Sequence, residues 1–185
     1  MRFNQNLQRT VLIGVGIVTL AATSGRASTA AGLHLGTEIY PQLDSANIYS
    51  DTANAREDIR QAILKAGSEH KHVLLVFGGN WCEDCHLLEL YFHDPGNASL
   101  LAANYVLVNV SVGEYDRNLD LARMYGIHLN KGVPALVVLN GAGHLLYAQR
   151  NGEFENMRVL NSAAVTTFLL KWKPRGRAHR RKIKA

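Results

Sequence analysis

Cysteine and proline are scarce in this sequence, with two and four among its 185 residues, and glycine, at 16, is not abundant. Two cysteines exclude a scaffold of several disulfides, and so few prolines and glycines exclude collagen and Pro/Gly-rich disordered chains. No apolar run reaches the roughly 18 residues expected of a membrane-spanning helix. Since 47% of the residues are hydrophobic and 19% are charged, the composition predicts one globular domain with short extensions.

The charge is distributed unevenly, although its net value is +5. Eight basic residues lie in the last 15 positions and three near the N-terminus, whereas residues 28–170 contain nine basic and all 15 acidic residues. The central part is therefore net negative, and the high pI does not indicate a basic globular surface. We interpret residues 173–185 as a basic, disordered tail, either solubilising or in weak contact with an anionic surface. We expect no nucleic-acid binding.

The N-terminus has the order of a secretory signal. A positively charged start precedes the apolar run Val11–Ala22, and small residues follow it. Twelve residues in this run suit the core of an export signal better than a membrane span. We predict a signal peptide over 1–27, cleaved after Ala27 or Ala30, with an uncleaved anchor as the alternative. In a bacterium with two membranes, such a protein is expected in the periplasm.

Hydrophobic spacing predicts one α/β domain over 51–172, preceded by an N-terminal arm or linker over 28–50. Continuous apolar runs are typical of strands buried on both faces, and apolar residues at helical spacing are typical of amphipathic helices. Strands are expected over 73–77, 105–110, 135–139 and 144–149. Helices are expected over 53–66 with Gly67 at the end, from Cys82 to before Pro95, over 116–125, and from after Ser162 to Trp172.

The order of these elements predicts how the sheet is built. Helical crossovers between the first three strands favour parallel pairing among them. The turn Asn140–Gly143 predicts a hairpin that adds an antiparallel edge. We interpret Pro95-Gly96 as a break and Asn97-Ala98-Ser99, which matches a glycosylation acceptor, as a turn. The expected fold is an α/β sandwich, a mixed β-sheet between helices.

The two cysteines lie at a position that favours redox chemistry. In Trp81-Cys82-Glu83-Asp84-Cys85 they are three residues apart, after the expected strand 73–77 and at the start of a helix. This spacing allows a small disulfide ring, and unpaired N–H groups at a helix N-terminus stabilise a thiolate. A thiolate attacks a disulfide, and a second thiol resolves the mixed disulfide. The pair therefore predicts thiol–disulfide exchange.

This segment resembles the strand and active-site turn of the thioredoxin superfamily. Residues 73–85 match both features, and Gly132-Val133-Pro134-Ala135 resembles the cis-proline loop of that superfamily. Residues 85–89 and 92–95 resemble its exported, thioredoxin_7-type branch. The resemblance covers residues 53–172 and implies a thioredoxin-like fold. It further implies an exported, monomeric thiol–disulfide oxidoreductase with protein dithiols or disulfides as substrates, an upstream redox partner and no cofactor.

The resemblance also implies roles for single residues. Cys82 would be the nucleophile and Cys85 the resolving cysteine. Trp81 would shape the exposed surface around the nucleophile. Pro134 would follow a cis peptide bond and face the cysteine pair, and the backbone of Val133 would pair with an extended substrate, as an added strand does.

Two differences from thioredoxin concern proton transfer and redox direction. Thioredoxin has a buried aspartate six residues before its first cysteine, and Val76 occupies that position here. Glu89, four residues after Cys85, can share its helix face, so it is either a replacement proton acceptor or a solvated carboxylate. Glu83-Asp84 replaces the usual Gly-Pro. Two acids beside the first cysteine disfavour its thiolate, which favours a reductant.

A metal-binding module, such as a copper chaperone, is the alternative from another functional class. His86 and His93, together with Cys82 and Cys85, form a set of side chains that suits copper or zinc. A second Cys-x-x-Cys is absent, which excludes a four-cysteine zinc site within one chain. A non-catalytic binding domain with vestigial cysteines is a third interpretation.

Overall fold

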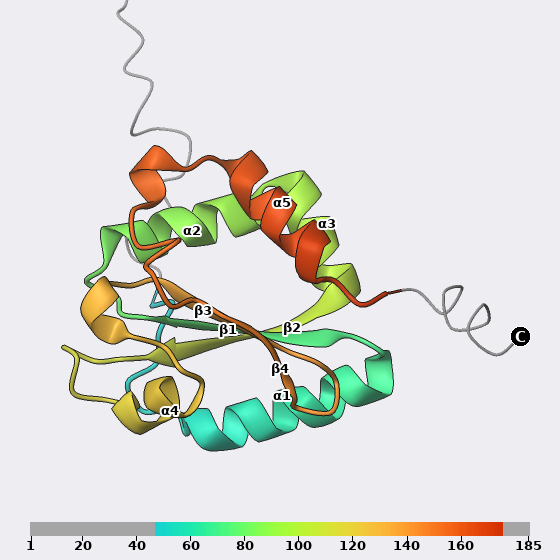
Figure 1. Ribbon diagram of the computed structural model, residues 1–185, viewed down its shortest axis with the longest axis horizontal. Helices are drawn as coiled ribbons and strands as arrows, with labels where there is room; N and C mark the ends of the chain where they lie inside the picture. The colour runs from blue at the N-terminus through green and yellow to red at the C-terminus, as the bar shows by residue number, and fades with distance from the viewer. Residues whose placement is uncertain (1–46, 176–185) are drawn as a thin grey trace, which may run out of the picture. The chain divides into compact units, whose positions relative to one another are not determined.

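The computed structural model describes residues 47–175, which form an α/β domain. A sheet lies between two layers of helices, with α2, α3 and α5 on one face and α1 and α4 on the other (Figure 1). The expected mixed sheet sandwiched by helices is thereby confirmed. The predicted signal peptide, most of the predicted arm and most of the basic tail lie outside the described residues.

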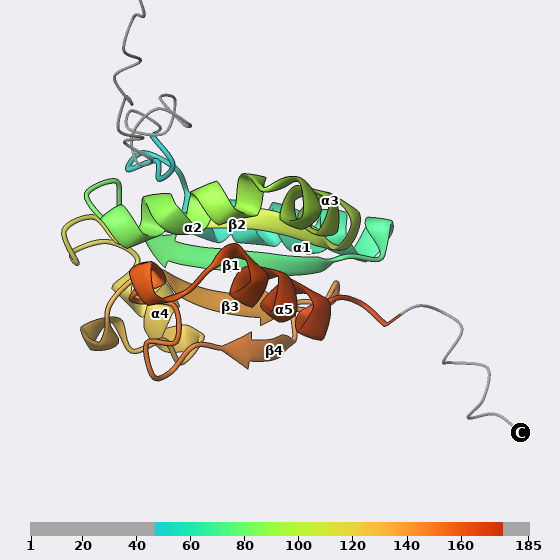
Figure 2. The same ribbon diagram turned by 90° about the horizontal axis from the view of Figure 1, so that it is seen from above.

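The described sheet has four strands in the order β2-β1-β3-β4 (Figures 1 and 2). Strand β1 pairs with β2 in parallel, and β3 pairs with both β1 and β4 in antiparallel orientation. The hairpin is confirmed, but the prediction that all three first strands run in parallel is wrong. The strands are β1 (His72–Gly78), β2 (Tyr105–Ser111), β3 (Ala135–Leu139) and β4 (Leu145–Ala148).

The reversal of β3 follows from where its connection begins and ends. Ser111, at the end of β2, pairs with Gly78, and Ala135, at the start of β3, pairs with Phe77. The connecting segment therefore stays at one end of the sheet, and β3 has to run back along β1. A helix in a connection predicts a crossover only when the chain also returns to the opposite end of the sheet.

Four of the five α-helices in residues 47–175 correspond to predicted helices, and one, α3, was not predicted. Helix α1 continues past Gly67 and ends at Glu69, and its C-cap His70 has a left-handed φ of 58°. Helix α4 is shorter than predicted, because Tyr115 and Asn118 have left-handed φ values. The helices are α1 (Ala55–Glu69), α2 (Glu83–His93), α3 (Pro95–Asn104), α4 (Leu119–Met124) and α5 (Ser162–Trp172), with 3-10 turns η1 (Leu129–Lys131) and η2 (Met157–Val159).

Helix α3 replaces the break and turn predicted after α2. Pro95 occupies the first helical turn, where its missing N–H costs nothing and its φ is suited to a helix. Asn97 is 1% exposed, and its side chain donates to the Tyr91 carbonyl (2.8 Å) and the Ser162 hydroxyl (3.0 Å). The predicted turn is therefore wrong, and Asn97 joins α2, α3 and α5 in one buried contact.

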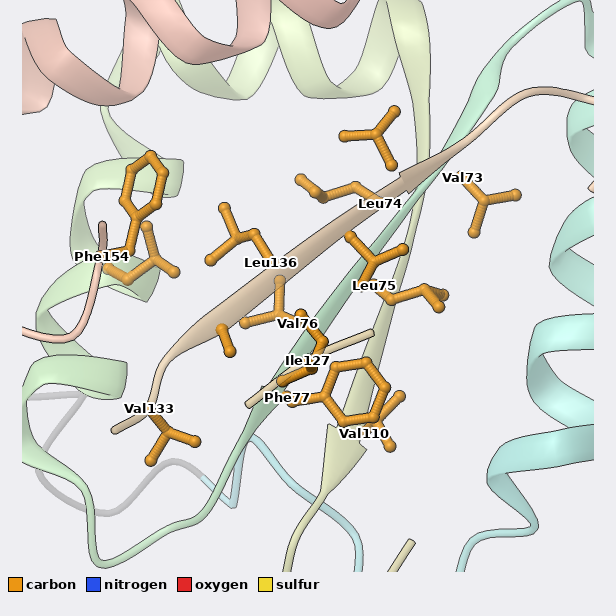
Figure 3. Packing of buried hydrophobic residues seen from close by; sticks show 14 of the residues in the cluster. Val73, Leu74, Leu75, Val76, Phe77, Val110, Ile127, Val133, Leu136 and Phe154 are labelled. Atoms are coloured by element: carbon orange, nitrogen blue, oxygen red, sulfur yellow. The ribbon is translucent and has the colours of Figure 1, made fainter. Parts of the chain in front are cut away.

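The core lies on both sides of β1 and β3. Nearly every residue of these strands is buried, as their continuous apolar runs predicted. Val76 is 2% exposed and lies among the hydrophobic side chains that Figure 3 shows, which include Leu136 and Ile127. The position of the thioredoxin aspartate is thus part of the hydrophobic core. Tyr49, in the segment interpreted as an arm, is also buried there.

Candidate active site

The cysteine pair lies where β1 ends and α2 begins. Cys82 and Cys85 form a disulfide with a Cα–Cα distance of 5.2 Å. Cys82 has an extended backbone and is the N-cap of α2, so the helix begins at Glu83, one residue later than predicted. The backbone N–H of Cys85 donates to the Cys82 Sγ at 3.1 Å. A cap sulfur that accepts a backbone N–H is well placed to hold negative charge after reduction.

The two sulfurs differ in what surrounds them. Cys82 is 6% exposed and Cys85 is 2% exposed. The Cys82 Sγ lies 3.5 Å from the carbonyl oxygen of Val133, in the loop before β3. The Val133–Pro134 peptide bond is cis, as we expected. The sequence-predicted loop and the cysteine pair are thus brought together.

Gln149, the residue directly after β4, hydrogen-bonds the proline loop. It is 2% exposed; its amide donates to the Pro134 carbonyl at 3.0 Å and accepts from the Leu136 N–H at 3.3 Å. A side chain of this kind fixes the loop that faces the disulfide. Sequence analysis missed it, because a single glutamine at the end of a hairpin strand carries no local signal.

An exposed aromatic pair includes Trp81, the residue directly before Cys82. Trp81 is 43% exposed, its indole N–H donates to the Gly113 carbonyl at 2.8 Å, and its ring centroid lies 5.3 Å from that of Tyr115. Tyr115, also missed by sequence analysis, is 41% exposed. A cavity of about 280 Å³ lies beside Trp81 and Asp51, and a larger one of about 870 Å³ lies beside Tyr115 and Gly132. Each ring of the pair therefore lines a different cavity.

Glu83 and Asp84 both have partners in the η2 segment. The Glu83 carboxylate forms an exposed ion pair with Arg158. The Asp84 carboxylate accepts from the Met157 N–H at 2.9 Å. These acids therefore attach η2 to the first turn of α2, and Arg158 offsets part of their charge beside Cys82.

Glu89 occupies a mostly buried position farther along α2. Its side chain is 17% exposed, and burial raises the pKa of its carboxyl above the usual value, opposed by the charges of His93 and His86. His86 Nε2 lies 2.8 Å from the Asn80 carbonyl, and His93 Nδ1 lies 2.9 Å from the Glu89 carbonyl. Within residues 47–175, no group of three or more Cys, His, Asp or Glu side chains is placed to hold a metal ion. The metal-binding alternative is therefore not favoured.

Comparison with known proteins agrees with this geometry. A family model described as thioredoxin-like matches residues 54–141. The crystal structure of a disulphide isomerase from Xylella fastidiosa Temecula1 is 35% identical, covers 69% of this chain and 97% of its own, and superposes with a TM-score of 0.65. The chain belongs to the thioredoxin-like family.

More distant thioredoxin-like structures are also similar. A thioredoxin from Thermus thermophilus is 24% identical, with a TM-score of 0.46 and coverage of 60% of this chain and 81% of its own. A DsbH oxidoreductase is 19% identical, with a TM-score of 0.36 and coverage of 71% and 90%. The comparison with curated proteins gave no match.

Family membership and the Cys82–Cys85 pair support thiol–disulfide oxidoreductase chemistry at a general level. Within the described part of the chain, no helix is both long and apolar enough to span a membrane.

Proposed function

We propose that the protein is an exported thiol–disulfide oxidoreductase that exchanges disulfides with protein substrates and acts on the reductant or isomerase side. The observation that supports this most is the approach of the Cys82 Sγ to within 3.5 Å of the Val133 carbonyl, beside a cis proline. That approach puts a redox-active sulfur next to backbone that an extended peptide can pair with.

In this proposal, Cys82 is the nucleophile and Cys85 the resolving cysteine. The Cys82 thiolate attacks a substrate disulfide, so one substrate sulfur leaves as a thiolate and the other is joined to Cys82. Cys85 then loses its proton and attacks the Cys82 Sγ, which releases the second substrate sulfur and restores the internal disulfide. An external dithiol donor reduces the pair again. The greater exposure of Cys82, at 6% against 2%, supports this division of roles.

The substrate would lie across the surface formed by Val133 and Trp81. An extended peptide hydrogen-bonded to the Val133 backbone has its side chains directed alternately to either side. The Trp81–Tyr115 ring pair offers an exposed apolar contact to one of them. Protein dithiols and disulfides in extended or unfolded segments are therefore the proposed substrates.

The redox direction rests on the balance of charge around Cys82. Glu83 and Asp84 disfavour a thiolate there, which makes the reduced form less stable and the protein more reducing. Arg158, paired with Glu83, and the N–H of Cys85 act in the opposite sense. We propose a potential closer to the roughly −270 mV of thioredoxin than to the roughly −120 mV of a strong disulfide donor.

Insulin reduction tests the activity, and a glutathione redox titration tests the direction. The purified protein should accelerate insulin reduction by dithiothreitol, whereas the Cys82→Ser/Cys85→Ser double variant should not. No acceleration by the wild type would contradict the proposal. Metal analysis after purification in mild reductant is the matching test of the metal-binding alternative, which requires bound copper or zinc in near-stoichiometric amount.

Export is proposed from the N-terminal pattern, with the periplasm as the destination. Expression of the full chain in a bacterium with two membranes should give a shortened protein in the periplasmic extract. Its N-terminus should follow Ala27 or Ala30. An unprocessed protein confined to the cytoplasm would contradict export without affecting the proposed chemistry.

A further inference from the structure

Asn80 attaches the active-site turn to a distant segment of the chain. Its side-chain oxygen accepts from the Tyr49 backbone N–H at 2.9 Å, and its amide donates to the Tyr49 carbonyl at 2.7 Å. Tyr49 is 1% exposed and packs over Gly78, where an added Cβ would meet both the Tyr49 phenol and the Cys85 Sγ. The residue two places before Cys82 is therefore held from the N-terminal segment.

His86 bonds the same residue from helix α2. Its Nε2 lies 2.8 Å from the Asn80 carbonyl oxygen. A carbonyl oxygen only accepts, so Nε2 carries the proton and donates it. His86 directly follows Cys85, and Asn80 lies two residues before Cys82. The hydrogen bond therefore closes a ring of chain that contains both cysteines, in parallel with their disulfide.

The second ring nitrogen of His86 agrees with this assignment. Within residues 47–175, Nδ1 of His86 is the only buried side-chain nitrogen or oxygen without a hydrogen-bond partner. A proton placed on Nδ1 would make it a buried donor without an acceptor, which is costly. The surroundings therefore select the tautomer with its proton on Nε2, in which the ring is a donor to the active-site turn.

The His86–Asn80 hydrogen bond spans the part of the site that reduction sets free. In the oxidised protein, the disulfide joins Cys82, the N-cap of α2, to Cys85 inside the first helical turn. Reduction breaks that link, whereas the His86–Asn80 bond contains no sulfur and can persist. Two groups that are already held in place react with a smaller loss of entropy than two mobile groups. The hydrogen bond therefore favours closure of the disulfide.

We propose that His86 is a positioning residue, which holds the Asn80 carbonyl so that the reduced Cys82 and Cys85 thiols stay close to their disulfide arrangement. The consequence is a more reducing cysteine pair. His86 neither touches substrate nor transfers a proton in this role. The inference rests on the proposed exchange function, and it assigns part of the redox direction of that function to a residue outside the cysteine pair.

Equilibration with glutathione measures this effect. The protein dithiol and one oxidised glutathione give the protein disulfide and two reduced glutathione molecules, so two electrons and two protons pass to glutathione. His86→Leu retains an apolar side chain without the donor. It should lower the equilibrium constant for protein disulfide formation by about two- to tenfold, the scale of one hydrogen bond. A tenfold decrease corresponds to a potential about 30 mV less reducing.

Two matched variants separate the hydrogen bond from charge and from general effects on the helix. His86→Gln presents an amide N–H at about the reach of the imidazole Nε2 and carries no charge, so it should keep the equilibrium constant within about twofold of the wild type. His93→Leu removes a second histidine of α2, whose Nδ1 lies 2.9 Å from the Glu89 carbonyl of the same helix. This variant should leave the constant unchanged.

Asn80→Ala tests the other end of the same arrangement. It removes the two side-chain bonds to Tyr49 and leaves the carbonyl that His86 bonds. The equilibrium constant should fall, because the carbonyl is then less well fixed. The combined effect of Asn80→Ala and His86→Leu should be smaller than the product of the two single effects, since both loosen one turn.

Nitrogen NMR of the wild-type histidines gives a direct readout that needs no variant. We expect His86 to carry its proton on Nε2 in both the oxidised and the reduced protein. A proton on Nδ1, or exchange between the two ring nitrogens in the reduced protein, would overturn the proposal. The bond would then be absent in the state on which it is proposed to act.

The equilibrium constants can overturn it as well. A constant for His86→Leu within about twofold of the wild type, or shifted toward the disulfide, would do so. An equal decrease in His86→Gln or in His93→Leu would also do so. Should His86→Leu not fold, Asn80→Ala and the NMR measurement decide. If the wild type fails to accelerate insulin reduction while these shifts are found, the exchange function fails and the positioning role stands.

Discussion

The two sulfurs of one disulfide lie in different environments. Cys82 caps the helix, adjoins the backbone of Val133 and borders the exposed ring of Trp81. Cys85 lies inside the first turn and adjoins the buried hydroxyl of Tyr49. Two residues of sequence thus separate a sulfur that adjoins the proline loop from one that adjoins Tyr49. The two environments predict that changes near Cys82 alter substrate exchange and redox potential, and that changes near Cys85 alter packing.

The largest effect that tests this difference is expected from removing each sulfur separately. Cys85→Ser should accumulate mixed disulfides with substrate proteins, because Cys82 can still attack but nothing resolves the product. Cys82→Ser should accumulate few. Non-reducing electrophoresis of both variants measures the trapped species. Equal trapping by the two variants would show that the roles are assigned wrongly.

Substitutions of the adjacent Gly78 and Gly79 test the packing around Cys85 and around Trp81, respectively. Gly78→Ala places a methyl group against the Tyr49 hydroxyl and the Cys85 sulfur, and should lower the free energy of unfolding by about 1–3 kcal/mol. Gly79→Ala meets the Trp81 ring instead, which is exposed and able to move, so its cost should be smaller. Denaturant titration of the oxidised proteins measures both. A larger loss in Gly79→Ala would reverse the comparison.

The acids beside Cys82 should have a moderate effect on the redox potential. Replacing Glu83-Asp84 with Gly-Pro favours the Cys82 thiolate and should raise the potential by up to about 30 mV per unit change of thiolate pKa. Arg158→Ala removes the cation paired with Glu83 and should shift the potential the opposite way, by less, since the pair is exposed. Titration against glutathione measures both. Shifts of the same sign would contradict the electrostatic explanation.

The smallest expected effect concerns the pH dependence of stability. Because burial raises the pKa of Glu89 in the folded protein above its usual 4.5, the native state holds this proton longer than the unfolded state. The free energy of unfolding should therefore fall as pH rises from about 4.5 through the raised pKa. Glu89→Gln should remove that part of the slope. Urea titrations at several pH values measure it, and an identical slope in the variant would mean that Glu89 titrates normally.

Local patterns were enough to predict the parts of the site that are continuous in sequence. The apolar run of β1, the Cys82–Cys85 spacing and the Val133–Pro134 loop each have a short signature, and the structure brings them together. The direction of β3 was not predictable from such signatures, since it depends on where a connection returns to the sheet. Helix α3 was missed because Pro95-Gly96 is typical of a break and also of a helical first turn.

Residues that act through distant contacts gave no signal in the sequence. Gln149 donates a hydrogen bond to the Pro134 carbonyl across a hairpin. Tyr49 hydrogen-bonds Asn80, which lies 31 residues later in the sequence and just before the cysteine pair. Gln149 is a single glutamine at the end of a hairpin strand, and Tyr49 is a single aromatic residue in a segment without periodicity. The family match begins at residue 54, after Tyr49. Only the folded arrangement relates such side chains to the site.

The two hydrogen bonds between Tyr49 and Asn80 also bear on how a minimal fragment should be chosen. A fragment cut at the start of the family match, or at residue 51, would keep all of the sheet, the five helices and both cysteines of the described region. It would lose the partner of Asn80 and open the space over Gly78 to solvent. Such a fragment would retain the described helices and strands in its sequence but would replace a dry environment around Cys85 with a wet one, so its kinetics should differ from those of the intact protein.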